Sequence, residues 1–253
     1  MTLDLKNIDA EHICCALADK KCAPGVKLKK EWLKQRFGEG YKFIKLNVSG
    51  KVFIEYGPAE YAWSPVEAPG YTLINCFWVS GSFKGQGYGN RLFDACLHDS
   101  RDKNGIIVIT SPKKRPFLAD KSFFTKKGFV VCDTAPPYFE LLVKQNNNAP
   151  LPKFRNSAKE MSGVDPTGLV VYYSDLCPFT DFYTEELRRV AAKYGIPIRT
   201  IKISSREDAW NLPSAFGIYC VFYQGKFLTH EILNESRFLK LFPGGLPVGH
   251  AVK

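Results

Sequence analysis

Apolar and polar positions divide the chain into two segments, each with its own series of strand-like and helix-like patterns. In the first segment, alternation over residues 41–47 and 52–56 predicts a hairpin, and continuous apolar runs at 71–79 and 106–109 predict buried strands. Strands are also expected at residues 129–132 and 138–143. Helical spacing is found at residues 8–37, with a break at Ala23-Pro24-Gly25, after Gly89, and at residues 116–127.

The second segment begins at Gly168 with a new α/β pattern. The expected order is a strand, a helix that starts near Cys177, a strand, a hairpin and a final helix, over residues 169–173, 177–195, 198–203, 219–229 and 235–242. The polar, proline-containing stretch between the segments has the composition of a linker. We therefore expect a first domain at residues 1–144, a linker at 145–164, a second domain at 165–243 and a Pro/Gly tail at 244–253.

Three alternating glycines lie between the apolar run that ends at Val79 and the helical pattern that follows. The stretch is Lys84-Gly85-Gln86-Gly87-Tyr88-Gly89. Glycine allows the backbone to adopt conformations that a Cβ forbids and to approach a ligand closely. In a strand-to-helix turn, successive N–H groups point toward one place in front of the positive end of the helix, and this geometry binds phosphate.

The glycine stretch matches neither common nucleotide-binding motif. The dinucleotide fingerprint fails at its sixth position, which is Asn90, and no Gly-Lys-Ser/Thr follows for a P-loop. The stretch resembles the pyrophosphate loop of the GCN5-related N-acetyltransferases, Arg/Gln-x-x-Gly-x-Gly/Ala, with Lys84 at the first position. The resemblance implies an α/β (α+β) fold with a mixed central sheet and acetyl-coenzyme A (acetyl-CoA) as co-substrate. It implies carrier-binding residues at Phe77, Trp78, Val79, Lys84, Gly85, Gln86, Gly87, Tyr88, Gly89 and Asn90.

The acid and base of the resembled family are not at their usual places. Many members have a Glu where this chain has Asn75, and a Tyr where it has Phe124. An amine acceptor still needs to lose a proton. Glu55 or Glu60 could accept it, and the departing thiolate could be protonated by Tyr138, Tyr88 or solvent.

The second segment resembles thioredoxin in the order of its elements. Cys177 stands where thioredoxin has its attacking cysteine, at a helix start that would lower a thiol pKa. Thr180 replaces the partner of the Cys-x-x-Cys pair, and Gly217 falls where the facing proline is expected. An acetyltransferase domain followed by such a degenerate domain resembles the YoaP-like acetyltransferases. The residues that carry this resemblance are His12-Ile13-Cys14-Cys15, Pro58-Ala59-Glu60-Tyr61-Ala62-Trp63 and Asn75-Cys76-Phe77-Trp78-Val79.

Composition narrows the ligands and the compartment. The formal net charge of +10 suits an anionic ligand such as coenzyme A, and no basic run with interleaved aromatic residues points to specific nucleic-acid binding. No apolar run has the length of a membrane span or of a secretion signal, so we expect a cytoplasmic protein without a membrane partner. The eight cysteines are expected as reduced thiols. Those at 14, 15 and 22, with His12, match no common zinc spacing, so no metal is expected.

The expected function is transfer of the acetyl group of acetyl-CoA to an amine of a small molecule or peptide, by direct attack in a ternary complex. Two rivals remain open at this point. One is a non-catalytic sensor of acyl-CoA, because Asn75 and Phe124 replace the usual base and acid. The other is a thiol-dependent redox protein that uses Cys177. The sequence also leaves open whether the second domain recruits a substrate, covers the active site or forms a homodimer.

Overall fold

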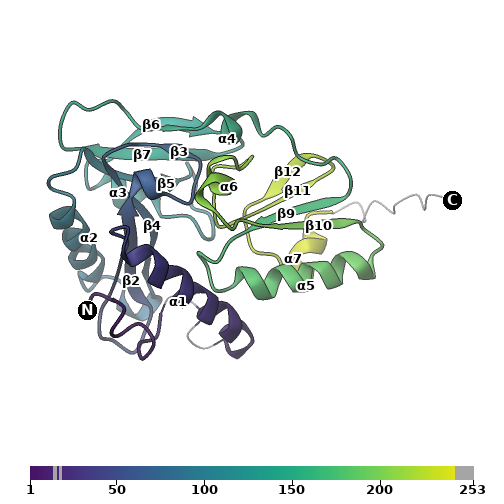
Figure 1. The fold of residues 1–253 in the computed structure, drawn as a ribbon, viewed down its shortest axis with the longest axis horizontal. Helices are drawn as coiled ribbons and strands as arrows, with labels where there is room; N and C mark the ends of the chain where they lie inside the picture. The colour runs from purple at the N-terminus through teal and green to yellow at the C-terminus, as the bar shows by residue number, and fades with distance from the viewer. Residues whose placement is uncertain (14–15, 17–18, 243–253) are drawn as a thin grey trace.

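A computed structural model of the chain describes residues 1–13, 16 and 19–242. Its two larger sheets lie side by side, with the first half of the chain around one and the second half around the other (Figure 1). The expected tail at 244–253 lies outside the described residues, as do Cys14 and Cys15.

The first sheet has six strands in the order β1-β2-β4-β5-β7-β6. All neighbouring strands run antiparallel except β4 and β5, which are parallel, so the sheet is mixed. Its strands are β1 (Lys42–Lys45), β2 (Val52–Pro58), β4 (Tyr71–Val79), β5 (Gly105–Thr110), β6 (Val130–Ala135) and β7 (Phe139–Gln145).

Helices cover both faces of this sheet. One face packs under α2 (Tyr88–Asp99) and α3 (Lys121–Thr125), whose Leu92, Phe93 and Phe124 are buried against it. The other face, called the α1 face below, packs under α1 (Ala23–Phe37) through Trp32 and Leu33.

The second sheet has the strand order β10-β9-β11-β12, with β9 and β10 parallel and the other pairs antiparallel. Its elements follow in the order expected from the sequence, with one short helix, α6, added after the second strand. They are β9 (Leu169–Tyr173), α5 (Thr180–Lys193), β10 (Ile198–Lys202), α6 (Arg206–Trp210), β11 (Tyr219–Tyr223), β12 (Lys226–Thr229) and α7 (Glu235–Lys240).

The two halves share their hydrophobic cores. Leu176, Ile203 and Leu212 of the second half are buried in the same cluster as Trp32 of α1, and Phe216 is buried against the first sheet. The segment with linker composition takes part, because it forms β8 (Lys153–Phe154), which pairs with β3 (Val66–Glu67), and α4 (Asn156–Glu160). The halves are therefore packed as one body across apolar surface.

Two helix boundaries differ from the sequence-based expectation, and both had been expected at a proline. Ala23-Pro24-Gly25 begins a helix and does not break one, because proline is well tolerated in the first turn, where its missing N–H is not needed. Pro116 does not open the next predicted helix. Phe117 has φ of +65°, so the helix starts only after Asp120, whose carboxylate accepts from the Ser122 N–H as an N-cap.

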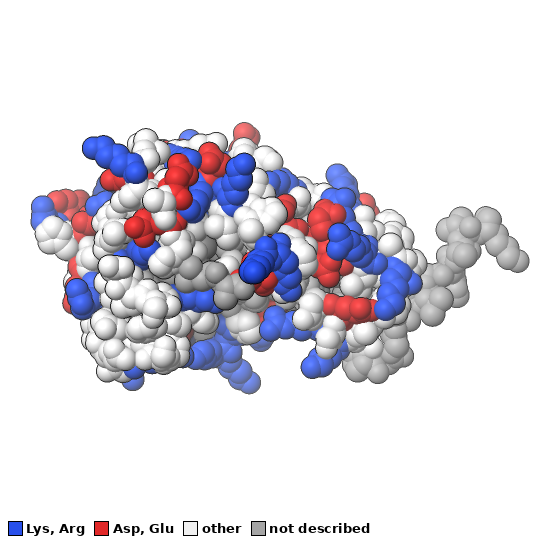
Figure 2. All heavy atoms as spheres, turned by 90° about the horizontal axis from the view of Figure 1, so that it is seen from below, with Lys and Arg blue, Asp and Glu red and all other residues white. Residues whose placement is uncertain are grey.

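Acidic and basic side chains are interspersed over the face seen in Figure 2, with basic side chains along its lower margin. No helix in the described part of the chain is long and apolar enough to cross a bilayer.

Candidate acyl-carrier and acceptor site

The first sheet opens between its two parallel strands. Pairing of β4 with β5 ends at Ile74 and Val108, whereas β4 continues to Val79 and pairs there only with β2. The β2–β4 register also shifts at this point, since Glu55 pairs with Cys76 and Tyr56 with Ile74, which leaves Asn75 as a bulge. Residues 75–79 therefore turn one backbone edge toward a gap that no strand among the described residues fills. An extended chain can pair with such an edge.

The glycine stretch forms a turn that ends in the N-terminus of α2. Gly85 and Gly87 have φ of +78° and +76°, in the left-handed region where a side chain is disfavoured, and Gly87 is the N-cap. Arg91 N–H is the first in this stretch to find a backbone acceptor, Gly87 O. Within the described residues, the amides of residues 85–90 donate to no protein acceptor. Six successive amides are thus available at the positive end of a helix.

Contacts hold this turn against the open edge of β4. A Cβ placed on Gly89 would lie 3.4 Å from the Phe77 ring and 3.5 Å from the Phe123 ring, so the start of α2 rests on β4 and α3. A Cβ on Gly85 or Gly87 would meet no atom within 4 Å. Glycine is needed at 85 and 87 for backbone conformation, and these two positions are open to a ligand.

The side chains of the carboxyl half of β4 point to opposite faces of the sheet. Phe77 and Val79 pack with the α2 and α3 cluster, whereas Trp78 pairs in register with Phe53 on the α1 face. Trp78 is 45% exposed. Of the three residues expected to bind the carrier here, Trp78 could do so only through its backbone, because its indole lies on the other side of the strand.

Glu55 lies beside the bulge but is bound within the protein. Its carboxylate accepts from Lys29 Nζ at 2.5 Å and from the Tyr41 hydroxyl at 3.1 Å, and both Lys29 and Glu55 are almost fully buried. Burial and the nearby Glu55 charge raise the pKa of Tyr41 well above its usual value. As placed, Glu55 is an ion-pair partner with both contacts on one oxygen, and it is not a solvent-exposed base.

Of the three other acid–base candidates, Tyr88 begins α2 at the glycine turn, and Glu60 and Tyr138 lie elsewhere. Glu60 is exposed two residues beyond Pro58, and Pro58 lies three strand residues, about 10 Å, from Glu55 beside the bulge. Tyr138 donates its hydroxyl proton to His230 Nδ1 at 2.7 Å, and burial raises the Tyr138 pKa to about 12. The Tyr138 hydroxyl is therefore engaged within the protein, and Glu60 lies beyond the end of β2.

The turn that carries Cys177 faces the first half of the chain. Leu176 O accepts from Lys29 Nζ at 2.7 Å, and Gly25 approaches Pro178 so closely that a Cβ there would lie 2.1 Å from its carbonyl oxygen. The Thr180 hydroxyl, at the position of a second redox cysteine, donates to the carbonyls of Ser174 and Cys177. Thr180 therefore closes the turn, and the turn itself is pressed against α1.

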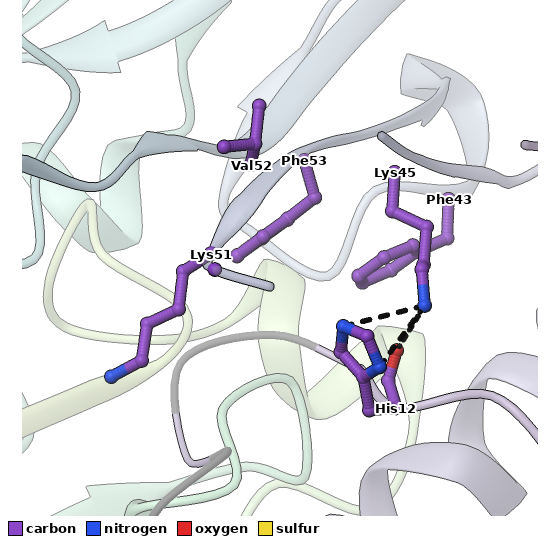
Figure 3. Close-up of a pocket in the computed structure, with 7 residues that line it drawn as sticks. His12, Phe43, Lys45, Lys51, Val52 and Phe53 are labelled. Carbon is purple, nitrogen blue, oxygen red and sulfur yellow. Dashed lines mark hydrogen bonds between the residues drawn. The ribbon is translucent and has the colours of Figure 1, made fainter. Parts of the chain in front are cut away.

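Figure 3 shows a cavity of about 10 Å³ near His12 on the α1 face, with room for about one water molecule. Lys45 Nζ is engaged there by Glu11 at 2.6 Å and by the His12 ring at 3.2 Å, and Lys51 points away. Burial and the nearby Lys45 charge lower the His12 pKa. In the described part of the chain, no group of three or more His, Cys, Asp or Glu side chains is arranged to hold a metal ion.

Lys29 is the site residue that sequence reasoning missed. It lies three residues after Val26 and four before Leu33, on the apolar stripe of α1. A lysine at such a position is a signal for a buried charge with a partner, and this signal could have been read from the sequence. Its partner on β2, Glu55, could not have been identified from the sequence.

A mixed sheet that opens at a central strand, beside a glycine turn and a helix N-terminus, is the arrangement of a GCN5-related N-acetyltransferase. The class of the protein is therefore an acyltransferase. A Bacillus subtilis (strain 168) protein named "Uncharacterized N-acetyltransferase YoaP" is 42% identical over 238 residues, which cover 93% of this chain and 94% of that protein. The chain belongs to this YoaP family of N-acetyltransferases, and the YoaP-like family profile matches residues 197–240.

Solved structures show weaker likeness. Ard1 from Thermoplasma volcanium is 18% identical, with a TM-score of 0.37 over 58% of this chain and 98% of that one. A protein from Desulfovibrio desulfuricans assigned to the GNAT family is 13% identical, with a TM-score of 0.39 over 56% and 89% of the two chains. Scores at this level leave the fold to be judged from the strand order itself.

Proposed function

We propose that the protein transfers the acetyl group of acetyl-CoA directly to an amine. One observation carries the proposal: the amides of residues 85–90, which have no acceptor among the described residues, lie next to the edge of residues 75–79 that no described strand pairs with. The first group suits a diphosphate and the second suits the extended, amide-containing pantetheine arm. A ligand that has both, joined end to end, is coenzyme A.

In this proposal the acetyl thioester ends at the bulge of Asn75, where β4 leaves β5. Backbone N–H groups on the open edge polarise the carbonyl oxygen as negative charge develops during attack. The amine approaches from the α1 face, opposite the carrier phosphates. Holding the two reactants in this order can supply about 7–11 kcal/mol of the barrier through proximity and orientation.

We further propose that water takes the proton of the acceptor amine. Glu55 is held by Lys29 and Tyr41, and Glu60 is exposed beyond Pro58, the last residue of β2. The departing thiolate is likewise protonated by solvent or by Tyr88, because Phe124 has no proton to give and the Tyr138 hydroxyl is bound to His230. Such a mechanism favours an amine that is partly neutral at the working pH.

Calorimetry with acetyl-CoA and with free coenzyme A tests the carrier site. We expect binding to the wild-type protein, and binding at least about tenfold weaker to Gly87→Ala, because the added Cβ disfavours the turn and faces the ligand. Gly38→Ala is the matched control, since Gly38 has φ of −64° and no atom within 4 Å of a built Cβ. Absence of heat with both ligands in the wild type would refute the proposal.

A carrier-binding sensor is the second candidate, and Phe124 and Asn75 favour it. Mass spectrometry of amines incubated with the protein and acetyl-CoA separates the two, because a sensor binds the carrier and releases no acetylated product. For the second half of the chain we propose a degenerate thioredoxin-like fold that supports the acceptor side. A redox role for Cys177 is less well supported, because its turn packs against α1 and Thr180 replaces the second thiol.

A further inference from the structure

Basic side chains without carboxylate partners gather around the glycine turn. Lys84 lies in the turn itself, and Arg91 lies in the first turn of α2. Lys126 and Lys127 follow directly after α3, the helix that packs against the start of α2. None of these four side chains forms an ion pair among the described residues. The region therefore carries positive charge that the protein leaves uncompensated.

Acidic side chains near these elements do not balance this charge. Asp120, at the start of α3, pairs with Lys114 at 3.6 Å. Glu140, on β7, pairs with Lys121 at 2.8 Å. Asp94 of α2 is exposed and is a single carboxylate beside four cations. A surplus of one sign of charge raises the local concentration of a ligand of the opposite sign, so this region suits a polyanion.

Lys127 is the cation that the structure holds between α2 and α3. Its Nζ lies 5.8 Å from the centroid of the Phe93 ring on α2 and 5.9 Å from that of the Phe123 ring on α3. A Cβ built on Gly89 would lie 3.5 Å from the same Phe123 ring. The Lys127 ammonium and the last glycine of the turn therefore both lie next to Phe123. Lys127 is half-buried, whereas Lys126 is exposed and has no ring contact within the described part of the chain.

We propose that the Lys127 ammonium binds the 3′-phosphate of coenzyme A, and that the site thereby selects the 3′-phosphorylated carrier. This inference rests on the proposed acetyltransferase function. The diphosphate and the 3′-phosphate of coenzyme A are attached to the same ribose. With the diphosphate on the amides of residues 85–90, a cation one aromatic ring away from Gly89 is placed for the second phosphate. A lysine ammonium binds phosphate as a point charge with three donors.

This contact distinguishes two kinds of acyl carrier. Dephospho-coenzyme A and the phosphopantetheine arm of a carrier protein both lack the 3′-phosphate, whereas free coenzyme A has it. The amides of residues 85–90 meet the same diphosphate in coenzyme A and in its dephospho form, so these amides cannot tell the two apart. Discrimination needs a cation outside the turn, and Lys127 supplies one at a fixed place.

The test is calorimetry with acetyl-CoA and with acetyl-dephospho-CoA, at low salt, on the full-length protein. We expect the wild type to bind acetyl-CoA about three- to tenfold more tightly. Lys127→Met should weaken acetyl-CoA binding alone and bring the two affinities to about the same value, whereas Lys127→Arg should keep most of the preference because the charge remains. Lys126→Met is the matched control: it removes the same charge one residue away and should keep the wild-type preference.

The outcomes separate this inference from the proposed function. If neither ligand binds the wild type, the proposed function fails as well. If both bind with equal affinity, the carrier site stands and the 3′-phosphate inference is overturned. The inference is also overturned if Lys127→Met weakens both ligands by the same factor, or if Lys126→Met lowers the preference as much as Lys127→Met does. An unchanged midpoint in urea unfolding shows that Lys127→Met is folded as the wild type is.

Discussion

Removal of the Lys29 ammonium should destabilise the whole protein, because the group is buried and joins both halves of the chain. Lys29 is fully buried and donates to Glu55 at 2.5 Å and to Leu176 O at 2.7 Å. In Lys29→Met the Glu55 carboxylate stays buried and keeps the Tyr41 hydroxyl, at 3.1 Å, as a neutral hydrogen-bond donor.

The expected loss of stability follows from the buried groups that the substitution leaves without their partner. Breaking a buried ion pair by removing one partner costs about 3–5 kcal/mol, since the remaining charge has lost its compensation. Leu176 O also loses a charge-assisted hydrogen bond. We therefore expect Lys29→Met to lower the free energy of unfolding by about 3–5 kcal/mol.

Urea unfolding followed by tryptophan fluorescence measures this change. Lys34→Met is the matched control on the same helix, because Lys34 pairs with Asp9 and Glu31 at a partly exposed position and should cost about 1 kcal/mol or less. The double variant Lys29→Met/Glu55→Leu should recover much of the loss, because no unpaired charge remains.

A loss in Lys29→Met no larger than that in Lys34→Met would refute the reasoning. The same series separates two roles for Glu55. If Glu55 mainly holds Lys29, Glu55→Gln should lose stability and keep measurable acetyl transfer. If turnover disappears while stability is unchanged, Glu55 is the base after all.

Three further predictions concern the turn and the joint between the halves. Burial lowers the His230 pKa to about 4. The contribution of neutral His230 to the free energy of unfolding should therefore be fully present above pH 6.5 and fall by about 3 kcal/mol as the pH drops from 6.5 to 4. Acid unfolding of His230→Gln should lack this loss. Tyr138→Phe should lower the free energy of unfolding in urea by about 1–3 kcal/mol, because the buried His230 Nδ1 loses its hydrogen-bond donor. A full loss of acetyl transfer at unchanged stability would contradict this structural role. Lys84→Ala should weaken acetyl-CoA binding in calorimetry at low salt and weaken it much less at high salt, since salt screens an exposed charge. If the variant loses the same factor in affinity at both salt concentrations, Lys84 does not contact a phosphate.

Local pattern carried the prediction of most of the elements. The continuous run at 106–109 became the fully buried strand β5, and the glycine stretch became a turn before a helix, because these outcomes depend on residues close in the chain. The start of α1 at Ala23 was missed, although the signal of proline in a first turn was present. The short strands β3 and β8 were also missed, since each is only two residues long and exists because the other pairs with it.

The sequence by itself determined the turn and the class of chemistry. Glycine at 85 and 87 is required by backbone dihedrals, which are a local property, and the amides that follow are available in any helix that starts there. Only the tertiary structure decided what the other candidates do. Strand register placed Trp78 on the α1 face, and packing of distant segments bound Glu55 to Lys29 and Tyr138 to His230. The residue type fixes which chemistry a side chain can perform. Its role depends on which distant groups form hydrogen bonds with it in the folded chain.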